Sequence, residues 1–275
     1  MPARPPEPSV ASLRDSPGDP AGDGESLALY WRFYWAVAEA QLARWLPRRP
    51  SRILDLAGGT AGSGAQAAAA GHRVIEVHDP HLNPHPDPGP ADPGSPAGAR
   101  GPAGPARRVI ADSGALRFLA DGCLDAVIAE NRVLSRHLVT EAAVAEIARV
   151  LRPGGRVLLS VDSLTLGMAL LAEQKRWAHL SDVPSAEVVL VPWPDGTMTR
   201  CFLADQLREL LTDAGLEVEW IRPRTVLSPS TVEHVLAASP RALPRLVRTE
   251  LNAPLNDDSL GVHLLASARR PDPPG

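Results

Sequence analysis

Few of the residues that mark specialised protein classes occur in this sequence. The two cysteines, Cys123 and Cys201, stand far apart without a CxxC motif, so we expect ordinary buried or partly buried thiols and no metal site. The formal net charge of −4 gives no basic excess to hold nucleic acid through its phosphates. No apolar run is long enough to span a bilayer, and the first residues lack the apolar core of a secretory signal. The expectation is a cytoplasmic protein without a nucleic-acid or membrane partner, its oligomeric state open.

Proline and glycine are plentiful, but they are concentrated in two segments. Residues 1–24 combine them with charge and carry almost no large apolar side chains, so burial there cannot offset the entropy of ordering. We expect a disordered tail at residues 1–24 and a flexible insertion at residues 83–107. Residues 25–50 contain LALYWRFYWAVAEAQLARWL, which predicts an N-terminal helix that Pro47 and Pro50 bring to an end.

Residues 51–270 alternate between strand and helix patterns. The predicted strands are SRILDLAGGT, HRVIEVHD, RRVIAD, CLDAVIAE, RVLLSVDS, EVEWIRPRTV and GVHLLASARR. The predicted helices include SGAQAAAAG, TEAAVAEIARVLR with Thr140 as its cap, LTLGMALLAEQKRWAHL, FLADQLRELLTDAGL and a stretch over residues 230–251. A hairpin is predicted to turn near Asp195 and Gly196. This alternation specifies an α/β fold with a parallel sheet, whose ligands bind at the carboxyl ends of the strands.

Five segments carry a resemblance to a known family: ILDLAGGTAG, RVIEVHDPHL, VIADSGALRFL, DGCLDAVIAENRVLSRHL and RVLRPGGRVLLSVDS. Their order and spacing resemble the class I methyltransferases that depend on S-adenosylmethionine (SAM), of the small-molecule type called methyltransferase domain 11. The resemblance covers roughly residues 50–270 apart from the insertion. It implies a doubly wound, mostly parallel seven-stranded sheet with an antiparallel last strand, and SAM as the cofactor. The last of the five segments is implied to be structural.

The first segment resembles the family's acidic-x-Gly-x-Gly-x-Gly loop. By that resemblance Asp55 orients the turn, and the backbone of Ala57, Gly58 and Gly59 lies against the amino-acid end of SAM. Glycine suits such a turn because a Cβ atom would obstruct the close approach. Ala57 and Ala61 stand where the family usually has glycine, and each adds a methyl group to the cofactor bed.

The second segment resembles the strand whose terminal carboxylate takes the two ribose hydroxyls of SAM. Asp79, followed by Pro80, is the residue that this resemblance assigns, because a carboxylate offers paired acceptors to a vicinal diol. Glu76 and His78 stay open as alternatives in a shifted register.

The third and fourth segments supply the other implied cofactor contacts. Asp112 resembles the acid that receives the adenine amino group, and Ser113 the residue whose amide meets a ring nitrogen. Glu130 and Asn131, at the end of the fourth strand, are implied to face the methionine portion.

The N-terminal helix holds an unusual share of the aromatic residues, which form only 4% of the chain. At helical spacing Tyr30 and Tyr34 share one face, as do Trp31 and Trp35. In the family an N-terminal helix often closes over the cofactor, so either tyrosine hydroxyl is a candidate contact to the SAM carboxylate. The alternative is a helix that simply packs against the sheet through its rings.

Methyl transfer from SAM needs alignment of donor and acceptor more than a fixed catalytic side chain. A hydroxyl or ammonium acceptor also needs a base, and Glu130, His137 and Asp162 lie near predicted strand ends. None is assigned as catalytic. Residues 163–201 and 228–257 are the expected acceptor-side insertions, with Trp193 and Arg200 as candidate pocket residues.

Two other functions compete with a methyltransferase. Gly62, Gly64 and Ala67 form a GxGxxA run, the fingerprint of an NAD(P)-dependent oxidoreductase, but they fall several residues after the strand and inside the predicted helix. The second alternative is a SAM-fold subunit that has lost catalysis, suggested by the two alanines and by the insertion where a helix is expected. The sequence does not identify the acceptor, and a natural product is a guess by family analogy.

Overall fold

The computed structural model describes residues 27–58, 62–82, 106–193, 196–254 and 261–273. The tail at residues 1–24, Gly59, Ala61 and Asp195 lie outside these residues, as does most of the predicted insertion. That insertion was predicted to end at residue 107, but Arg107 already opens strand β3 (Arg107–Ile110). Its backbone pairs with Ile75 of the neighbouring strand, which fixes the end of the insertion one residue earlier.

The described strands form one sheet whose first five members run parallel. Their order is β3, β2 (Arg73–His78), β1 (Arg52–Asp55), β4 (Leu124–Ala129) and β5 (Leu151–Ser163). Beside β5 lies β9 (His263–Arg269), which is antiparallel to it and pairs in turn with β8 (Glu217–Pro223). These seven strands, of which the last in sequence, β9, is antiparallel, confirm the expected fold class.

The strand count differs from the expectation, because the described sheet has nine strands rather than seven. The predicted hairpin, β6 (Val189–Pro192) and β7 (Met198–Phe202), joins the same sheet. Asp162 and Ser163 pair with Cys201 and Phe202, so β7 adds to β5 at its carboxyl end. The 13-residue length of β5 makes this possible, since its last residues reach far enough to pair on the hairpin.

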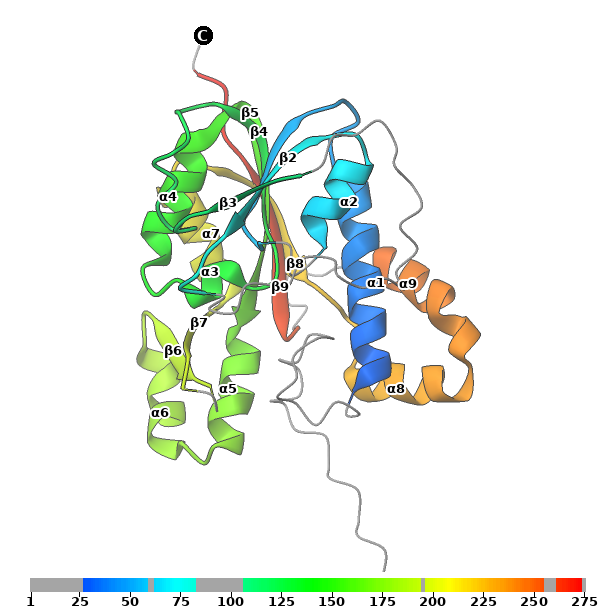
Figure 1. The fold of residues 1–275 in the computed structure, drawn as a ribbon. Helices are drawn as coiled ribbons and strands as arrows, with labels where there is room; N and C mark the ends of the chain where they lie inside the picture. Colours follow the sequence, from blue (N-terminus) through cyan, green and yellow to red (C-terminus); the bar gives the residue numbers. More distant parts are fainter. Residues whose placement is uncertain (1–26, 59–61, 83–105, 194–195, 255–260, 274–275) are drawn as a thin grey trace, which may run out of the picture.

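Helices cover both faces of the sheet (Figure 1). On one face lie α1 (Ala28–Trp45), α2 (Ser63–Ala69), α8 (Pro229–Ala238) and α9 (Leu243–Leu251). On the other face lie α4 (Thr140–Val150) and α7 (Ala204–Asp213). Three further helices, α3 (Val133–Arg136), α5 (Leu164–Glu173) and α6 (Trp177–Asp182), lie toward the carboxyl ends of the parallel strands, with the β6–β7 hairpin. None of the described helices has the length and apolar content needed to cross a membrane.

Local sequence explains where α1 ends and shows two errors in the predicted helices. Leu46 is extended (ψ 140°) directly before Pro47, because a residue that precedes proline is disfavoured in helical conformation. Thr140 is the first helical residue rather than the cap, and its hydroxyl instead donates to the carbonyl of His137. The predicted single helix from residue 164 to 180 is two helices, since Lys175 adopts a left-handed φ of 56° between α5 and α6.

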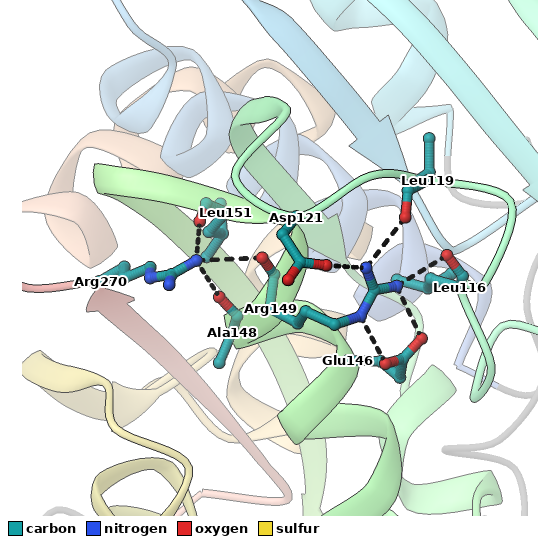
Figure 2. Close-up of polar contacts among 8 residues, drawn as sticks. All are labelled: Leu116, Leu119, Asp121, Glu146, Ala148, Arg149, Leu151 and Arg270. Atoms are coloured by element: carbon teal, nitrogen blue, oxygen red, sulfur yellow. Dashed lines mark hydrogen bonds and ion pairs between the residues drawn. The ribbon is translucent and has the colours of Figure 1, made fainter.

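Two arginines fasten the loop and strand that surround α4 (Figure 2). The guanidinium of Arg149 binds the Glu146 carboxylate through Nε, 2.8 Å, and Nη2, 3.0 Å. It also donates to the carbonyls of Leu116 and Leu119 at 2.9 Å each and to Asp121 at 2.6 Å. Arg270, just after β9, donates to the last carbonyls of the helix region: Ala148, Arg149 and Leu151. The contacts of the RVLRPGG segment are therefore structural, since they join α4 to the preceding loop and to the residue after β9.

Candidate active site

The turn after β1 is organised by a buried carboxylate. Asp55 is fully buried; its Oδ1 accepts from the amide of Ala57 at 2.9 Å and its Oδ2 from the hydroxyl of Ser63 at 2.8 Å. Gly58 adopts φ 66° in this turn, a conformation that favours glycine. The acid thus orients the turn as predicted from the sequence, with the backbone of Ala57 and Gly58 at the carboxyl edge of the sheet.

The start of α2 lies close to this carboxylate. A Cβ atom on Gly64 would lie 2.5 Å from Glu76 Oε1 and 2.8 Å from Asp55 Oδ2, so only glycine fits. Gly62 precedes α2 with φ 68° and Ala67 is buried within it. Gly62 was predicted to lie inside the helix; it lies at its N-cap, because α2 begins one residue later. Glu76, which was an alternative to Asp79 for the ribose contact, lies against Gly64, and its Oε2 pairs with Arg108 Nε at 3.6 Å.

Asp79 follows β2 and is 1% exposed. Its Oδ1 accepts from the amide of His81, 2.9 Å, and its Oδ2 accepts from the amide and hydroxyl of Ser113, 2.8 and 2.7 Å. Burial alone would raise the pKa of Asp79, but the hydrogen bonds from Ser113 and His81 outweigh it and lower the pKa. Asp79 is therefore held ionised, and it joins the ends of β2 and β3. His78, the other alternative, is the buried last residue of β2, and Pro80 is exposed.

Ser113 extends this contact to a histidine. His137 Nε2 lies 2.7 Å from Ser113 Oγ. Because the Ser113 hydroxyl proton goes to Asp79, His137 Nε2 is the donor in that contact, which leaves its Nδ1 as an acceptor. Burial lowers the pKa of His137. Asp112 lies at this edge with an exposed side chain, and its Oδ1 accepts from the amide of Gly114 at 2.7 Å.

The end of β4 combines buried charge with unusual backbone. Glu130 forms a buried ion pair with Arg224, which follows β8 and also donates to Gln41 of α1 at 2.8 Å. Asn131 and Arg132 both adopt left-handed conformations, with φ of 55° and 58°. Consecutive non-glycine residues in this region are strained, and such strain concentrates at functional sites.

The two predicted tyrosines of α1 are both buried against β8 and β9. The Tyr30 hydroxyl lies 3.0 Å from Thr225 Oγ1. The Tyr34 ring stacks edge-on against His263 at 5.5 Å between centroids, with the Arg224 guanidinium 5.8 Å from its centroid. Both hydroxyl-bearing rings thus contribute to packing, as the alternative interpretation proposed, and α1 reaches the carboxyl edge of the sheet.

Sequence reasoning missed part of the polar cluster at this edge. Arg132 Nε lies 2.9 Å from Asp162 Oδ1, and His263 Nε2 lies 3.5 Å from the same oxygen. His263 opens β9 and is 1% exposed. Its only sequence signal is a polar residue at the start of an apolar strand. Arg224 offered a similar signal, a charge near the end of the predicted strand EVEWIRPRTV.

The two candidate pocket residues of the hairpin, Trp193 and Arg200, have different neighbours. The Trp193 ring is buried and lies 4.8 Å from the Arg132 guanidinium, so it borders this cluster. Arg200 instead pairs with Glu141 of α4 at 2.6 Å and joins β7 to that helix.

Comparison with known proteins identifies the domain. Residues 54–159 match the family model described as a methyltransferase domain, which spans every element from β1 into β5. Residues 54–159 therefore belong to a methyltransferase domain. A search of the curated proteins finds no match.

Solved structures support the fold of the methyltransferase. One is a SAM-dependent methyltransferase from Methanosarcina mazei, with TM-score 0.52 and 17% identity over 85% of this chain and 98% of that chain. Another is a chain from a complex with the Haloferax volcanii Trm112 methyltransferase activator, with TM-score 0.51 and 17% identity over 89% and 92%. A Pyrococcus horikoshii protein gives TM-score 0.51 and 13% identity over 87% and 91%.

The residues of the methyltransferase fit its cofactor, SAM. Ribose hydroxyls and an adenine amino group are donors, and the ends of β2 and β3 present the ionised Asp79 and the exposed Asp112 as acceptors. A carboxylate has about four acceptor positions, and three donors occupy Asp79 in the structure, which leaves one position for a ribose hydroxyl. In the turn after β1, Gly58 adds backbone that carries no side chain.

The carboxyl group of Asp55 gives a testable pH dependence of stability. Burial raises its pKa from 3.8 to about 6, with the Glu76 carboxylate adding to the rise and hydrogen bonds from Ala57 and Ser63 opposing it. Between these values the folded protein binds more protons than the unfolded chain, so this group lowers stability as the pH rises from about 4 to 6. Asp55→Asn removes that loss. The variant is expected to gain on the order of 2 kcal/mol relative to wild type between about pH 4 and 7.

Urea unfolding of both proteins at several pH values measures this difference. Any constant offset reflects the altered hydrogen bonds and does not bear on the prediction. A free-energy difference that stays flat across this range would show that the carboxyl titrates normally.

Proposed function

We propose that this methyltransferase transfers the methyl group of SAM to a small-molecule acceptor. The observation that supports it is the enclosure of the carboxyl edge beyond β4. Apolar residues of α1, α5, β6, β7 and α8 form one buried cluster there, which includes Phe33, Leu166, Val191 and Trp193. An apolar cover of this kind suits a small ligand more than a large one, and the net charge of −4 gives no attraction for a polyanion.

In this proposal the two halves of the edge have different tasks. Asp55, Asp79, Asp112 and Ser113, at the ends of β1 to β3, hold SAM, with Ala57 and Gly58 supplying backbone in the turn. SAM supplies a methyl group already activated by its sulfonium. The chain's own residues align the acceptor with it and exclude water, and the cover formed by α1 and the hairpin serves the second purpose.

Replacement of Asp79 by alanine tests the cofactor assignment. The variant should bind S-adenosylhomocysteine, the product form of the cofactor, about 1–3 kcal/mol more weakly, the loss expected for hydrogen bonds to a charged acceptor. Isothermal titration calorimetry measures the affinity. Asp213→Ala, an exposed acid at the end of α7, is the matched control and should bind like wild type.

Three outcomes would count against parts of the proposal. Unchanged affinity in Asp79→Ala would show that another acid takes the ribose. A thermal shift of the wild type with NAD(P)H, and none with SAM or its product, would favour the oxidoreductase; no shift with any of them would favour a degenerate subunit. Because Asp79 also anchors Ser113, thermal unfolding of the unliganded variant separates lost binding from a lost fold.

A further inference from the structure

Unsatisfied buried polar atoms gather in one place in this protein. In the described part of the chain, ten buried side-chain nitrogen and oxygen atoms lack a hydrogen-bond partner. Seven of the ten belong to five residues: Glu130, Arg132, Asp162, Arg224 and His263. Three of these seven atoms, Arg132 Nε, Asp162 Oδ1 and His263 Nε2, contact one another as ion pairs, and the other four have no such contact. An unpaired buried polar atom costs about 1–3 kcal/mol, so a cluster of them calls for an explanation. A bound polar ligand is the simplest one, because it would supply the missing partners.

These five residues lie at the half of the sheet edge beyond β1, where the family resemblance places only Glu130 against SAM, at its methionine portion. Glu130 and Arg132 follow β4, Asp162 lies near the end of β5, His263 opens β9, and Arg224 follows β8. The acids assigned to SAM follow β1, β2 and β3. The order of strands reverses between β1 and β4, and ligands of such sheets meet at this point. The cluster therefore lies where a second reactant would face the cofactor.

Within the cluster, His263 and Asp162 have the arrangement of a base and its orienting acid. His263 Nε2 lies 3.5 Å from Asp162 Oδ1, while Nδ1 has no partner. Catalytic hydrogen bonds are often this long before the substrate is bound. With Nε2–H directed to the carboxylate, Nδ1 carries the lone pair. Arg132 Nε, 2.9 Å from the same oxygen, holds Asp162 in place.

The electrostatic surroundings keep the His263 ring neutral. Burial lowers its pKa well below the usual value, and the charges of Arg132 and Arg224 lower it further. Burial raises the pKa of Asp162, against the opposing charge of Arg132. At His263 the positive charges dominate, which disfavours a protonated amine and favours an oxygen that gains negative charge.

We propose that His263 is the general base of this methyltransferase, that Asp162 positions its ring, and that the acceptor is an aromatic alcohol with an un-ionised hydroxyl. This inference rests on the proposed function. Aromatic rings beside the cluster suit such an acceptor: the Tyr34 ring packs edge-on at 5.5 Å from the His263 ring, and the Trp193 ring lies beneath Arg132.

The step balances without any further reactant. The acceptor oxygen forms a bond to the methyl carbon, and the carbon–sulfur bond of the donor breaks with its electron pair going to sulfur. The hydroxyl proton passes to His263 Nδ1, and the Asp162 carboxylate stabilises the imidazolium that forms. The proton leaves to solvent afterwards.

Two phenols of different acidity test the role of His263. With tritiated SAM in a mildly alkaline buffer, 4-methoxyphenol keeps its proton, whereas 4-nitrophenol is largely ionised and needs no base. His263→Gln keeps a donor toward Asp162 but lacks the basic nitrogen. Its methylation rate should fall about 10²- to 10⁴-fold on 4-methoxyphenol. The loss on 4-nitrophenol should be far smaller, and imidazole should restore activity to His263→Ala on 4-methoxyphenol.

The controls separate failure of this inference from failure of the proposed function. His234→Gln, an exposed histidine of α8, should match wild type. His263→Gln should bind S-adenosylhomocysteine like wild type in calorimetry, since it does not touch the SAM half of the edge. An equal loss on both phenols would overturn the base assignment. Methyl transfer to amines or thiols but to no phenol would overturn the acceptor class. A wild type that binds S-adenosylhomocysteine but methylates no acceptor at all would overturn it as well. Wild type that does not bind the product would instead remove the proposed function.

Discussion

Replacing Arg224 by methionine is expected to lower the free energy of unfolding by about 3–5 kcal/mol, the cost of breaking a buried ion pair on one side. The Arg224 side chain is 1% exposed and that of its partner Glu130 is 5% exposed. The Arg224 guanidinium also donates to the Gln41 side chain at 2.8 Å, and the Gln41 amide donates back to the Arg224 carbonyl at 3.1 Å. Methionine fills much of the same volume but leaves the Glu130 charge buried without a partner. Urea unfolding followed by circular dichroism measures the loss.

The double variant Arg224→Met with Glu130→Met distinguishes this cause from lost packing. Replacement of both members of a buried pair by apolar residues is often close to neutral, because their desolvation penalty disappears together with their attraction. We expect the double variant to recover most of the stability that the single variant loses. A double variant that is as unstable as the two single losses added together would show that the arginine acts through its shape.

Replacing Arg149 by methionine is expected to cost about 2–4 kcal/mol of stability and to weaken binding of S-adenosylhomocysteine. The guanidinium joins α4 to the carbonyls of Leu116 and Leu119 (Figure 2). Those carbonyls belong to the same loop as Asp112 and Ser113, so loosening the loop adds an ordering cost to binding. Arg149→Lys keeps the charge but not the fork of donors, and should show an intermediate loss.

Arg152→Met is the matched control for Arg149. The Arg152 side chain is 54% exposed, and its ion pair with Asp125 is a surface contact worth about 1 kcal/mol or less. Chemical unfolding and calorimetric titration of the three variants measure both effects. A stability loss no larger for Arg149→Met than for Arg152→Met would contradict the role of Arg149 as the anchor of this loop.

The cofactor half of the site was largely predictable, because its residues are fixed by strand ends. Asp55 and Asp79 each follow a strong apolar strand pattern, and parallel strands bring their carboxyl ends to one edge. The pattern did not reveal that the Asp79 carboxylate accepts hydrogen bonds from Ser113, which is 34 residues away along the chain. That contact depends on the pairing of β2 with β3 across the intervening insertion.

The acceptor half was predicted only in part. Glu130 and Asp162 were recognised at strand ends, but Arg224 is 94 residues from Glu130 and carries no local signature of its partner. His263 resembles any polar residue at the start of a strand. Tyr34 was one of two candidate contacts to the SAM carboxylate, and the sequence did not reveal that its ring packs on His263 and beside Arg224.

The sequence by itself determined the alternation of strands and helices, the place of the glycine turn and the carboxylates that follow β1, β2 and β3. These features are local, because hydrophobic periodicity and turn chemistry act over a few residues. Only the tertiary structure decided that the hairpin joins β5 and that residues from β4, β5, β8 and β9 share one buried cluster. Such pairings depend on which distant segments fold against each other, and burial then lowers the pKa of His263 and raises that of Asp162.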